Sequence, residues 1–221
     1  MDNALIVFLK YPEAGRVKTR LARVIGNEKA CAIYKLLAEG VVEKICLENP
    51  GTYDVFIFFT PAEKESEIKE WMKFDTQFVP QKGDILGERM SNAFRQIMRG
   101  SGCKRAVIIG TDCPGVDAIL VENAFEVLKG KDIVIGPCED GGYYLLGMTS
   151  HVAVCFEQRF VSDVFVDIDW STERVFDQTM KKLQKNNLSY GILKTLADID
   201  TSEDLYRYAH ENKGIQDYLA V

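Results

Sequence analysis

The sequence has no long run of apolar residues. Its first apolar stretch, Ala4 to Phe8, is shorter than the core of a secretion signal and is followed by no small-residue cleavage pattern. No other segment reaches the roughly eighteen apolar residues that a membrane-spanning helix needs. We therefore expect a cytoplasmic protein with no membrane span.

Histidine and closely spaced cysteine are scarce as well. The chain has two histidines and six cysteines, and no cysteines form a C-x-x-C pair. Zinc sites and disulfide frameworks are recognised by such spacings. Reduced thiols of the kind found in cytosolic proteins are therefore expected.

A surplus of positive charge is also missing. Lys and Arg number 27 against 33 Asp and Glu, which gives a formal net charge of −6. Affinity for nucleic-acid backbones comes from surplus Lys and Arg, so we expect no nucleic-acid partner. Anionic small molecules would have to be bound by local groups of basic residues.

The overall composition is that of an ordinary globular protein. Of the 221 residues, 47% are hydrophobic and 27% are charged, and the chain has no internal repeat, low-complexity tract or Pro/Gly/Ser-rich linker. A single domain over residues 1–221 is expected from this length. The sequence leaves the oligomeric state open, a homodimer included.

Short apolar segments alternate with amphipathic patterns along the chain. Near-continuous apolar runs suit strands buried on both faces, and strands that alternate with helices predict a mainly parallel sheet. Ligands of such sheets bind at the carboxyl ends of the strands. The expected strands are 4–9, 53–59, 77–79, 105–109, 132–135 and 143–146, and the expected helices are 27–46, 62–72, 87–98, 116–128 and 172–183.

Three local features add to this pattern. Asn27 is the expected N-cap of the helix that follows it. Gln81 and Gly83 join a strand to a helix, where they could cover a nucleotide base or ribose or form a plain turn. Residues 161–168 fit either an edge strand or a flap over the site.

The first expected strand is followed by a loop rich in positive charge. Lys10, Arg16, Lys18 and Arg20 lie within eleven residues of an otherwise acidic chain, and Gly15 marks a turn among them. Backbone amides in a tight loop, lysine as a point charge and arginine as a two-pronged donor together suit a di- or triphosphate. The alternative is a solvated basic loop at the end of a strand.

Asp112 lies just after the expected strand 105–109, at a loop that opens toward the next helix. A hard carboxylate there can bind Mg²⁺, which in turn bridges phosphates. An Asp before a Pro-containing turn is equally typical of an N-cap or an Asx turn. The sequence leaves these two roles open.

The next strand is followed by Asp140, Gly141 and Gly142, and then by Tyr143. Paired glycines let a backbone approach a ligand closely. Asp140 can orient a sugar hydroxyl, bind a metal or act as a base. Because Asp-Gly is also a strong hairpin signal, a plain turn is the alternative.

Near the end of the chain, Thr201 and Asp204 fit the capping box of a last helix. Capping does not explain Asp200, which precedes them. Asp200 is a candidate second carboxylate that could share one metal ion with Asp112.

Five motifs occur in order over nearly the whole chain. They are KYPEAGRVKTRLA at 10–22, GTDCP at 110–114, DGGYYLLG at 140–147, DWST at 169–172 and DIDT at 198–201. In this order they resemble the nucleotide-diphospho-sugar transferase superfamily, which has the GT-A fold. Within it, the chain is similar to a bacterial glycosyltransferase-A-like family, some members of which are named arsenosugar-biosynthesis glycosyltransferases.

The resemblance implies a three-layer α/β/α sandwich with a mixed, mainly parallel sheet of about seven strands. It implies a nucleotide in the N-terminal half, with Lys18 and Arg20 on its phosphates. It also implies Mg²⁺ or Mn²⁺ on Asp112 and Asp200, and a small-molecule acceptor facing Asp140. Lys18, Asp112 and Asp140 are the candidate catalytic residues.

The resemblance favours a glycosyltransferase that uses a nucleotide-diphospho-sugar donor. The alternative is a nucleotidyltransferase, similar to guanylyltransferases, that joins a nucleoside triphosphate to a phosphorylated acceptor and releases pyrophosphate. Glycosyltransferases of this fold usually carry an Asp-x-Asp pair, whereas Cys113 and Pro114 follow Asp112 here. A third hypothesis is a non-catalytic nucleotide-binding protein.

Overall fold

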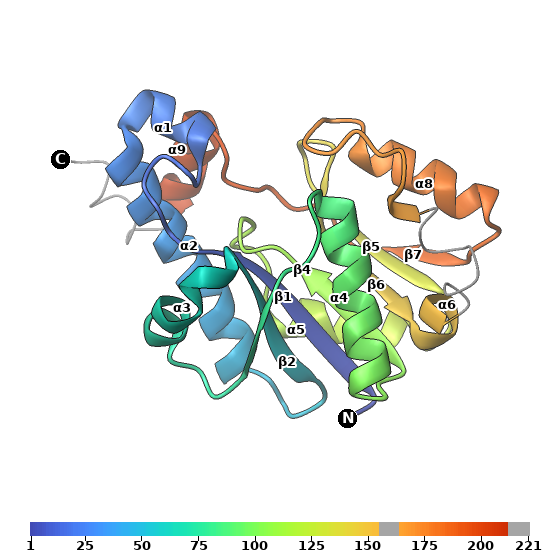
Figure 1. The fold of residues 1–221 in the computed structure, drawn as a ribbon. Coiled ribbons are helices and arrows are strands. Elements are labelled where there is room, and N and C mark those ends of the chain that lie inside the picture. Colours follow the sequence, from blue (N-terminus) through green and yellow to red (C-terminus); the bar gives the residue numbers. More distant parts are fainter. Residues whose placement is uncertain (155–163, 212–221) are drawn as a thin grey trace.

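A seven-stranded sheet runs through the middle of the protein (Figure 1). It is seen in a computed structural model that describes residues 1–154 and 164–211. Across the sheet the strands follow the order β3-β2-β1-β4-β6-β5-β7. Their bounds are β1 Asn3–Lys10, β2 Asp54–Thr60, β3 Gln77–Pro80, β4 Arg105–Ile109, β5 Ile133–Pro137, β6 Tyr143–Thr149 and β7 Tyr190–Ile192.

Strand direction confirms the predicted mixed, mainly parallel sheet. Strand β1 pairs in parallel with β2 and β4, and β5 pairs in parallel with β7. Among the strands described, β6 alone runs against its neighbours, β4 and β5. The carboxyl ends of β1, β4 and β5 therefore lie along one edge of the sheet, which is where ligands of such folds bind.

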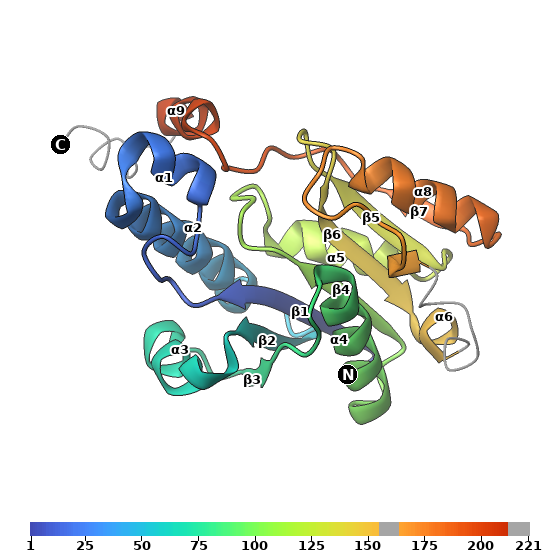
Figure 2. The same ribbon diagram turned by 45° about the horizontal axis from the view of Figure 1, so that its top comes forward.

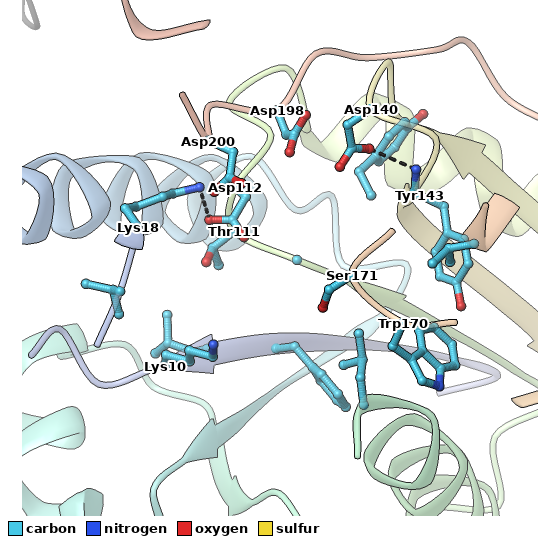
Figure 3. A pocket seen from close by; sticks show the side chains of 18 of the residues that line it. Lys10, Lys18, Thr111, Asp112, Asp140, Tyr143, Trp170, Ser171, Asp198 and Asp200 are labelled. Atoms are coloured by element: carbon cyan, nitrogen blue, oxygen red, sulfur yellow. Dashed lines mark hydrogen bonds and ion pairs between the residues drawn. The ribbon is translucent and has the colours of Figure 1, made fainter. Parts of the chain in front are cut away.

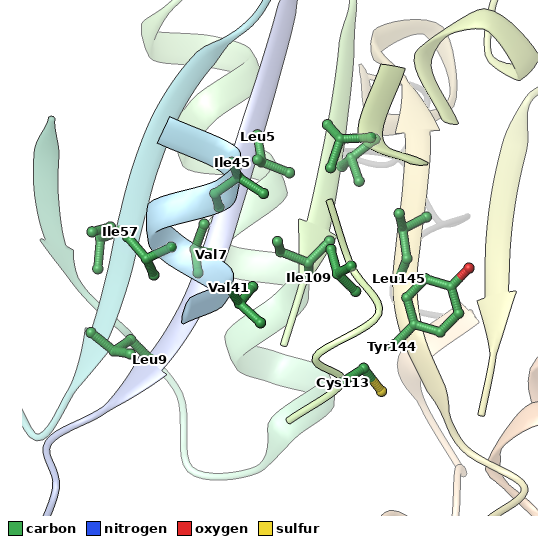
Figure 4. Close-up of a cluster of buried hydrophobic side chains, with 14 of the residues drawn as sticks. Leu5, Val7, Leu9, Val41, Ile45, Ile57, Ile109, Cys113, Tyr144 and Leu145 are labelled. Atoms are coloured by element: carbon green, nitrogen blue, oxygen red, sulfur yellow. The ribbon is translucent and has the colours of Figure 1, made fainter. Parts of the chain in front are cut away.

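Helices cover both faces of the sheet, as expected for three layers (Figure 2). Alternate residues of β1 point to opposite faces, so Leu5 and Val7 join one core cluster while Ala4 and Ile6 join the other. Figure 4 shows the first cluster. On that face lie α2 Asn27–Leu47, α3 Glu65–Met72 and α5 Ala118–Val127, and on the other lie α4 Leu86–Gly100, α6 Ser150–Val154 and α8 Val175–Lys185.

A smaller third cluster packs two early helices of the chain against the last described helix. Leu21 of α1 (Thr19–Ile25) packs with Ile33 of α2 and with Leu205 of α9 (Ser202–Glu211). Figures 1 and 2 both show α9 beside α1. The last part of the chain thus returns to the loop that follows β1.

Most predicted elements are confirmed to within a few residues, and the departures have local reasons. The expected helix 62–72 is divided into a 3₁₀ turn, Ala62–Lys64, and α3. Gly26 rather than Asn27 occupies the N-cap of α2, and no side chain caps that helix. Helix α1 and strand β7 were not predicted, because seven and three residues are too few to show a period.

The expected edge strand or flap at 161–168 lies partly outside the described residues. In the described part, Val164 and Phe165 are helical and buried, so a strand there is wrong. Phe165 packs against Phe94 of α4 with ring centroids 6.3 Å apart. No helix in residues 1–154 and 164–211 is long and apolar enough to cross a membrane.

The predicted capping box of α9 is confirmed. The backbone N–H of Asp204 donates to Thr201 Oγ1 at 3.3 Å, and the backbone N–H of Thr201 donates to Asp204 Oδ2 at 2.9 Å. Asp204 Oδ2 also accepts from the backbone N–H of Asp200 at 3.2 Å. The box therefore fixes the start of α9 together with the residue before it.

We predict that Asp204→Ala lowers the free energy of unfolding by about 1 kcal/mol, because it leaves backbone donors at the helix start without partners. Urea unfolding monitored by circular dichroism would measure this. Asp177→Ala, which removes an exposed carboxylate from the first turn of α8, is the matched control and should change stability little. Equal losses in both variants would contradict the capping role.

Candidate functional site

The candidate site is a pocket of about 560 Å³ at the carboxyl ends of β1, β4 and β5. Figure 3 shows labelled side chains from these strand ends and from later loops converging on it. Most of the predicted site residues line it: Lys10, Lys18, Arg20, Gln81, Asp112, Asp140, Gly142, Tyr143 and Asp200. The other three, Gly15, Gly83 and Gly141, lie in the loops that shape it and are not lining residues.

Lys18 provides a fixed positive charge. It takes a left-handed backbone conformation, φ 47° and ψ 45°, at the N-cap of α1, a conformation uncommon for residues other than glycine. Its side chain is only 3% exposed, and its ammonium lies 2.5 Å from Oδ1 of Asp112. A buried cation is costly unless it is paired, so this ion pair fixes where the charge points.

Asp112 faces the pocket and does not cap a helix. The N-cap of α5 is Asp117, whose Oδ1 accepts from the backbone N–H of Leu120 at 2.8 Å. The Asp112 carboxylate is 53% exposed and is paired with Lys18. Of the two roles left open by the sequence, capping therefore belongs to a different aspartate.

A chain segment returning from β7 brings Asp198 and Asp200 to this edge. Three backbone N–H groups of this segment donate to backbone carbonyls at the strand ends. Leu193 donates to Ile135 at 2.9 Å, Leu196 to Pro137 at 3.1 Å and Ile199 to Asp112 at 3.1 Å. Ile199 is buried in the cluster of α1, α2 and α9. In an extended chain alternate side chains point to opposite sides, so both aspartates face away from that cluster and line the pocket.

Asp198 is a site residue that the sequence reasoning missed. Burial, and after it the nearby negative charge of Asp140, raise the pKa of Asp198 to about 6. No ion pair to Asp198 is found within the described part of the chain. The signal for it was present in the DIDT motif, where two aspartates flank one apolar residue that must be buried.

The potential metal ligands form two groups. One oxygen of Asp140, one of Asp198 and the sulfur of Cys138 lie within 4.8 Å of one another. The predicted metal-binding pair, Asp112 and Asp200, is arranged differently, because each carboxylate contacts a basic side chain. Asp112 contacts Lys18 at 2.5 Å, and Asp200 contacts Arg20 at 3.3 Å. All four carboxylates line the same pocket, so the set supplies hard oxygen donors with one thiol beside them.

The turn that carries Asp140 is both structural and part of the pocket. Asp140 Oδ1 accepts from the backbone N–H of Gly142 at 2.8 Å, which is the predicted turn alternative. Gly141 has φ 85°, and a Cβ there would lie 2.1 Å from the carbonyl oxygen of Glu173. The structure thus gives Gly141 a packing role against the 169–175 loop.

Three residues predicted to bind the nucleotide also form hydrogen bonds within the loops around the pocket. The Gln81 side-chain amide donates to the carbonyl of Phe58 at 2.8 Å while the residue lines the pocket. Gly83 has φ 127°, and its carbonyl accepts from Arg89 Nε at 2.9 Å. Lys10 is exposed at the end of β1, where its backbone bonds the hydroxyl of Tyr34.

An aromatic wall closes the opposite side. Tyr143 and Trp170 make an edge-to-face contact with centroids 6.5 Å apart, and Figure 3 shows Ser171 between them and the charged residues. Ser171 has φ 64°. Its loop is held from outside by Asp169, whose backbone N–H and carboxylate both bond the side chain of Gln178. No role was predicted from the sequence for this DWST motif, residues 169–172.

Comparison with known proteins gives a consistent picture. The model of a family described as an uncharacterized protein conserved in bacteria (DUF2064) matches residues 46–172. A candidate nucleotide-diphospho-sugar transferase of Desulfovibrio desulfuricans G20 has 32% identity and a TM-score of 0.84, covering 98% of both chains. The 2-phospho-L-lactate guanylyltransferase of Methanocaldococcus jannaschii is 22% identical over 86% of this chain and 75% of its own length.

More distant structures show the same fold. CMP:2-keto-3-deoxy-manno-octonic acid synthetase complexed with CTP has a TM-score of 0.61 at 11% identity, covering 97% of this chain and 99% of that one. Rv0371c of Mycobacterium tuberculosis H37Rv, complexed with manganese, has a TM-score of 0.57 at 15% identity, covering 96% and 100%. The Desulfovibrio and Methanocaldococcus proteins are both described as transferases, and the resemblance to the nucleotide-diphospho-sugar transferase superfamily is confirmed.

We predict that Asp198→Asn raises stability at neutral pH and flattens its pH dependence. The pKa of Asp198 is raised from 3.8 to about 6 on folding, so the folded state binds more protons than the unfolded state between these values. Wild-type stability should therefore fall as pH rises from about 4 to about 6, by about 1–2 kcal/mol from this group.

Urea unfolding with a chelator present, at intervals from pH 4 to pH 8, would test this. The variant should gain its full advantage above pH 6 and show almost none at pH 4. Asp177→Asn, which removes an exposed carboxylate on α8, is the control and should keep the wild-type slope. Parallel curves for wild type and Asp198→Asn would contradict the assignment.

Proposed function

The chain belongs to the bacterial family DUF2064, and we propose that it is a nucleotidyltransferase that joins a nucleoside triphosphate to a small acceptor and releases pyrophosphate. The observation that supports this most directly is the buried Lys18 ammonium at 2.5 Å from Asp112. It provides a preorganised cation at the point where the phosphate-binding loop meets the carboxylates. Fixed charges of this kind stabilise the charge that develops in phosphoryl chemistry.

The charges around Lys18 suit a triphosphate. Lys10, Arg16 and Arg20 also line the pocket, so four basic side chains come from one short loop. A nucleoside triphosphate carries about two more negative charges than the diphosphate of a sugar nucleotide. Arg16, Lys18 and Arg20 are each paired with a carboxylate, so a triphosphate that binds with a divalent cation would take over these cations while the metal ion takes over the carboxylates.

The carboxylates suit a divalent metal ion. Burial and, after it, the negative charge of Asp140 keep the pKa of Asp198 high, and a divalent cation would offset that negative charge. Asp112 with Asp200, and Asp198 with Asp140, are the residues that would hold Mg²⁺ or Mn²⁺. When bound, such an ion neutralises phosphate oxygens and the charge of the leaving pyrophosphate. The manganese complex of Rv0371c supports this proposal by similarity of fold.

The protein's own residues divide the remaining work. Lys18 holds the phosphates in place, while Gln81 lies where the base and ribose would extend from them. Asp140, at the carboxyl end of β5, lies on the acceptor side, where it can orient or deprotonate the attacking group. The aromatic wall of Tyr143 and Trp170 limits access of water from that side.

Glycosyl transfer is the second candidate, and one observation favours it. The Desulfovibrio protein, at 32% identity over 98% of both chains, is described as a candidate nucleotide-diphospho-sugar transferase. Against it, no carboxylate stands two residues after Asp112, where Pro114 is found. The further carboxylates come instead from the distant 198–200 segment.

A thermal-shift series would separate the two. We predict that one nucleoside triphosphate with Mg²⁺ raises the melting temperature more than any nucleotide sugar does, because a ligand that binds only the folded state stabilises it. Asp112→Asn should remove the Mg²⁺-dependent part of the shift, whereas the control Asp177→Asn should retain it. A larger shift with a nucleotide sugar would assign glycosyl transfer, and no shift with either class would refute both.

Lys18 can be tested separately. We predict that Lys18→Met weakens triphosphate binding about 10- to 100-fold, since charge-assisted hydrogen bonds contribute about 1.5–3 kcal/mol. Arg23→Met, which removes an exposed cation on the same helix outside the pocket, is the matched control. Isothermal titration calorimetry would measure both, and similar losses would show that general charge rather than Lys18 attracts the phosphates.

A further inference from the structure

Two thiols meet beside the site. The sulfur of Cys113, in the loop after β4, lies 3.5 Å from the sulfur of Cys138, at the end of β5. Cys113 directly follows Asp112, and Cys138 stands two residues before Asp140. The pair therefore bridges the loop that carries the donor-side carboxylate and the turn that carries the acceptor-side carboxylate.

We propose that Cys113 and Cys138 form a reversible disulfide that turns nucleotide binding off. The second half of this inference rests on the proposed function, whereas the first half rests on geometry alone. A disulfide has an S–S distance of about 2.05 Å, so the two sulfurs must approach by about 1.5 Å. That movement draws the Asp112 loop toward the Asp140 turn and away from Lys18.

Both cysteines are held in place by backbone bonds, so the approach cannot be absorbed by a loose loop. The carbonyl of Cys113 accepts from Val116 at 3.2 Å. The N–H of Cys138 donates to the carbonyl of Gly142 at 3.0 Å, and Cys138 also forms a β-bridge with Leu196. The part of the approach that side-chain rotation does not supply therefore passes to the neighbouring carboxylates, and a misplacement of about 1 Å at an active site can cost about 100-fold in activity.

The accessibility of the two thiols sets the order of the chemistry. Cys138 is half-buried and keeps some exposed surface, whereas Cys113 is 2% exposed at the border of the core, beside Tyr144 (Figure 4). The Cys138 thiolate attacks one sulfur of a low-molecular-weight disulfide and releases one thiol. The Cys113 thiolate then attacks the Cys138 sulfur of the mixed disulfide and releases the second thiol.

The exchange is balanced. The two protein thiols lose two protons and two electrons, and the small disulfide gains them as it becomes two thiols. A reducing thiol reverses both steps. Pairs of this kind in reducing compartments are typically transient and serve as redox sensors.

The experiment uses the full chain, first reduced and then incubated with oxidised glutathione. Intact mass should fall by two hydrogen atoms, and non-reducing peptide mapping should link the peptides of Cys113 and Cys138. Triphosphate affinity measured by calorimetry with Mg²⁺ should fall about tenfold or more and recover with dithiothreitol. Cys138→Ala should form no such link, and its affinity after oxidation should equal its own affinity before oxidation, while the control Cys31→Ala should behave like wild type.

Two results would overturn the inference. If oxidised glutathione gives only mixed disulfides or no product, the thiols do not pair. If the link forms and triphosphate affinity is unchanged, the pair is not a switch. A reduced protein that binds no triphosphate would refute the proposed function instead, and with it the switch, whereas peptide mapping would still decide whether the pair forms. Because Cys138 is only half-buried, its alanine variant provides this test even if Cys113→Ala does not fold.

Discussion

The site depends on one backbone connection, the pairing of the 193–199 segment with the ends of β5 and β4. Leu196 donates to Pro137 of β5, and Ile199 donates to the carbonyl of Asp112 after β4. These bonds place residues 193–199 at the edge where the basic loop that follows β1 lies. Without them, Asp198 and Asp200 would not face Lys18, and α9 would not reach the cluster it shares with α1.

The charged side chains that line the pocket do not fully balance one another. One buried ammonium faces Asp112, while burial and the nearby charge of Asp140 together raise the pKa of Asp198 to about 6. A folded protein that keeps such an arrangement gives up stability for function. An anionic ligand and a divalent cation would complete it together, since each supplies the charge that the other lacks.

Much of this could be predicted from the sequence, because buried strands and long amphipathic helices leave strong patterns. The loops were also predictable, since parallel strands gather their carboxyl ends at one edge. The convergence of particular side chains was not. Asp198 became a site residue because the burial of Ile199 directs it into the pocket, and Cys113 meets Cys138 only through the order of the strands. The DIDT motif carries a signal for Asp198 only once Ile199 is known to be buried, and the meeting of the two cysteines has no signature in local spacing.

The reversed strand β6 explains both the site and the thiol pair. It lies between β4 and β5, and strands are spaced about 4.8 Å apart, so the ends of β4 and β5 are separated by about twice that distance. Asp112 follows one end and Asp140 follows the other, which leaves room for a ligand between them. Beside that space, on the side of the core cluster that contains Leu5 and Val7, the loop after β4 and the end of β5 come close enough for Cys113 and Cys138 to meet. Any link between those thiols therefore acts on the spacing that separates the donor side from the acceptor side.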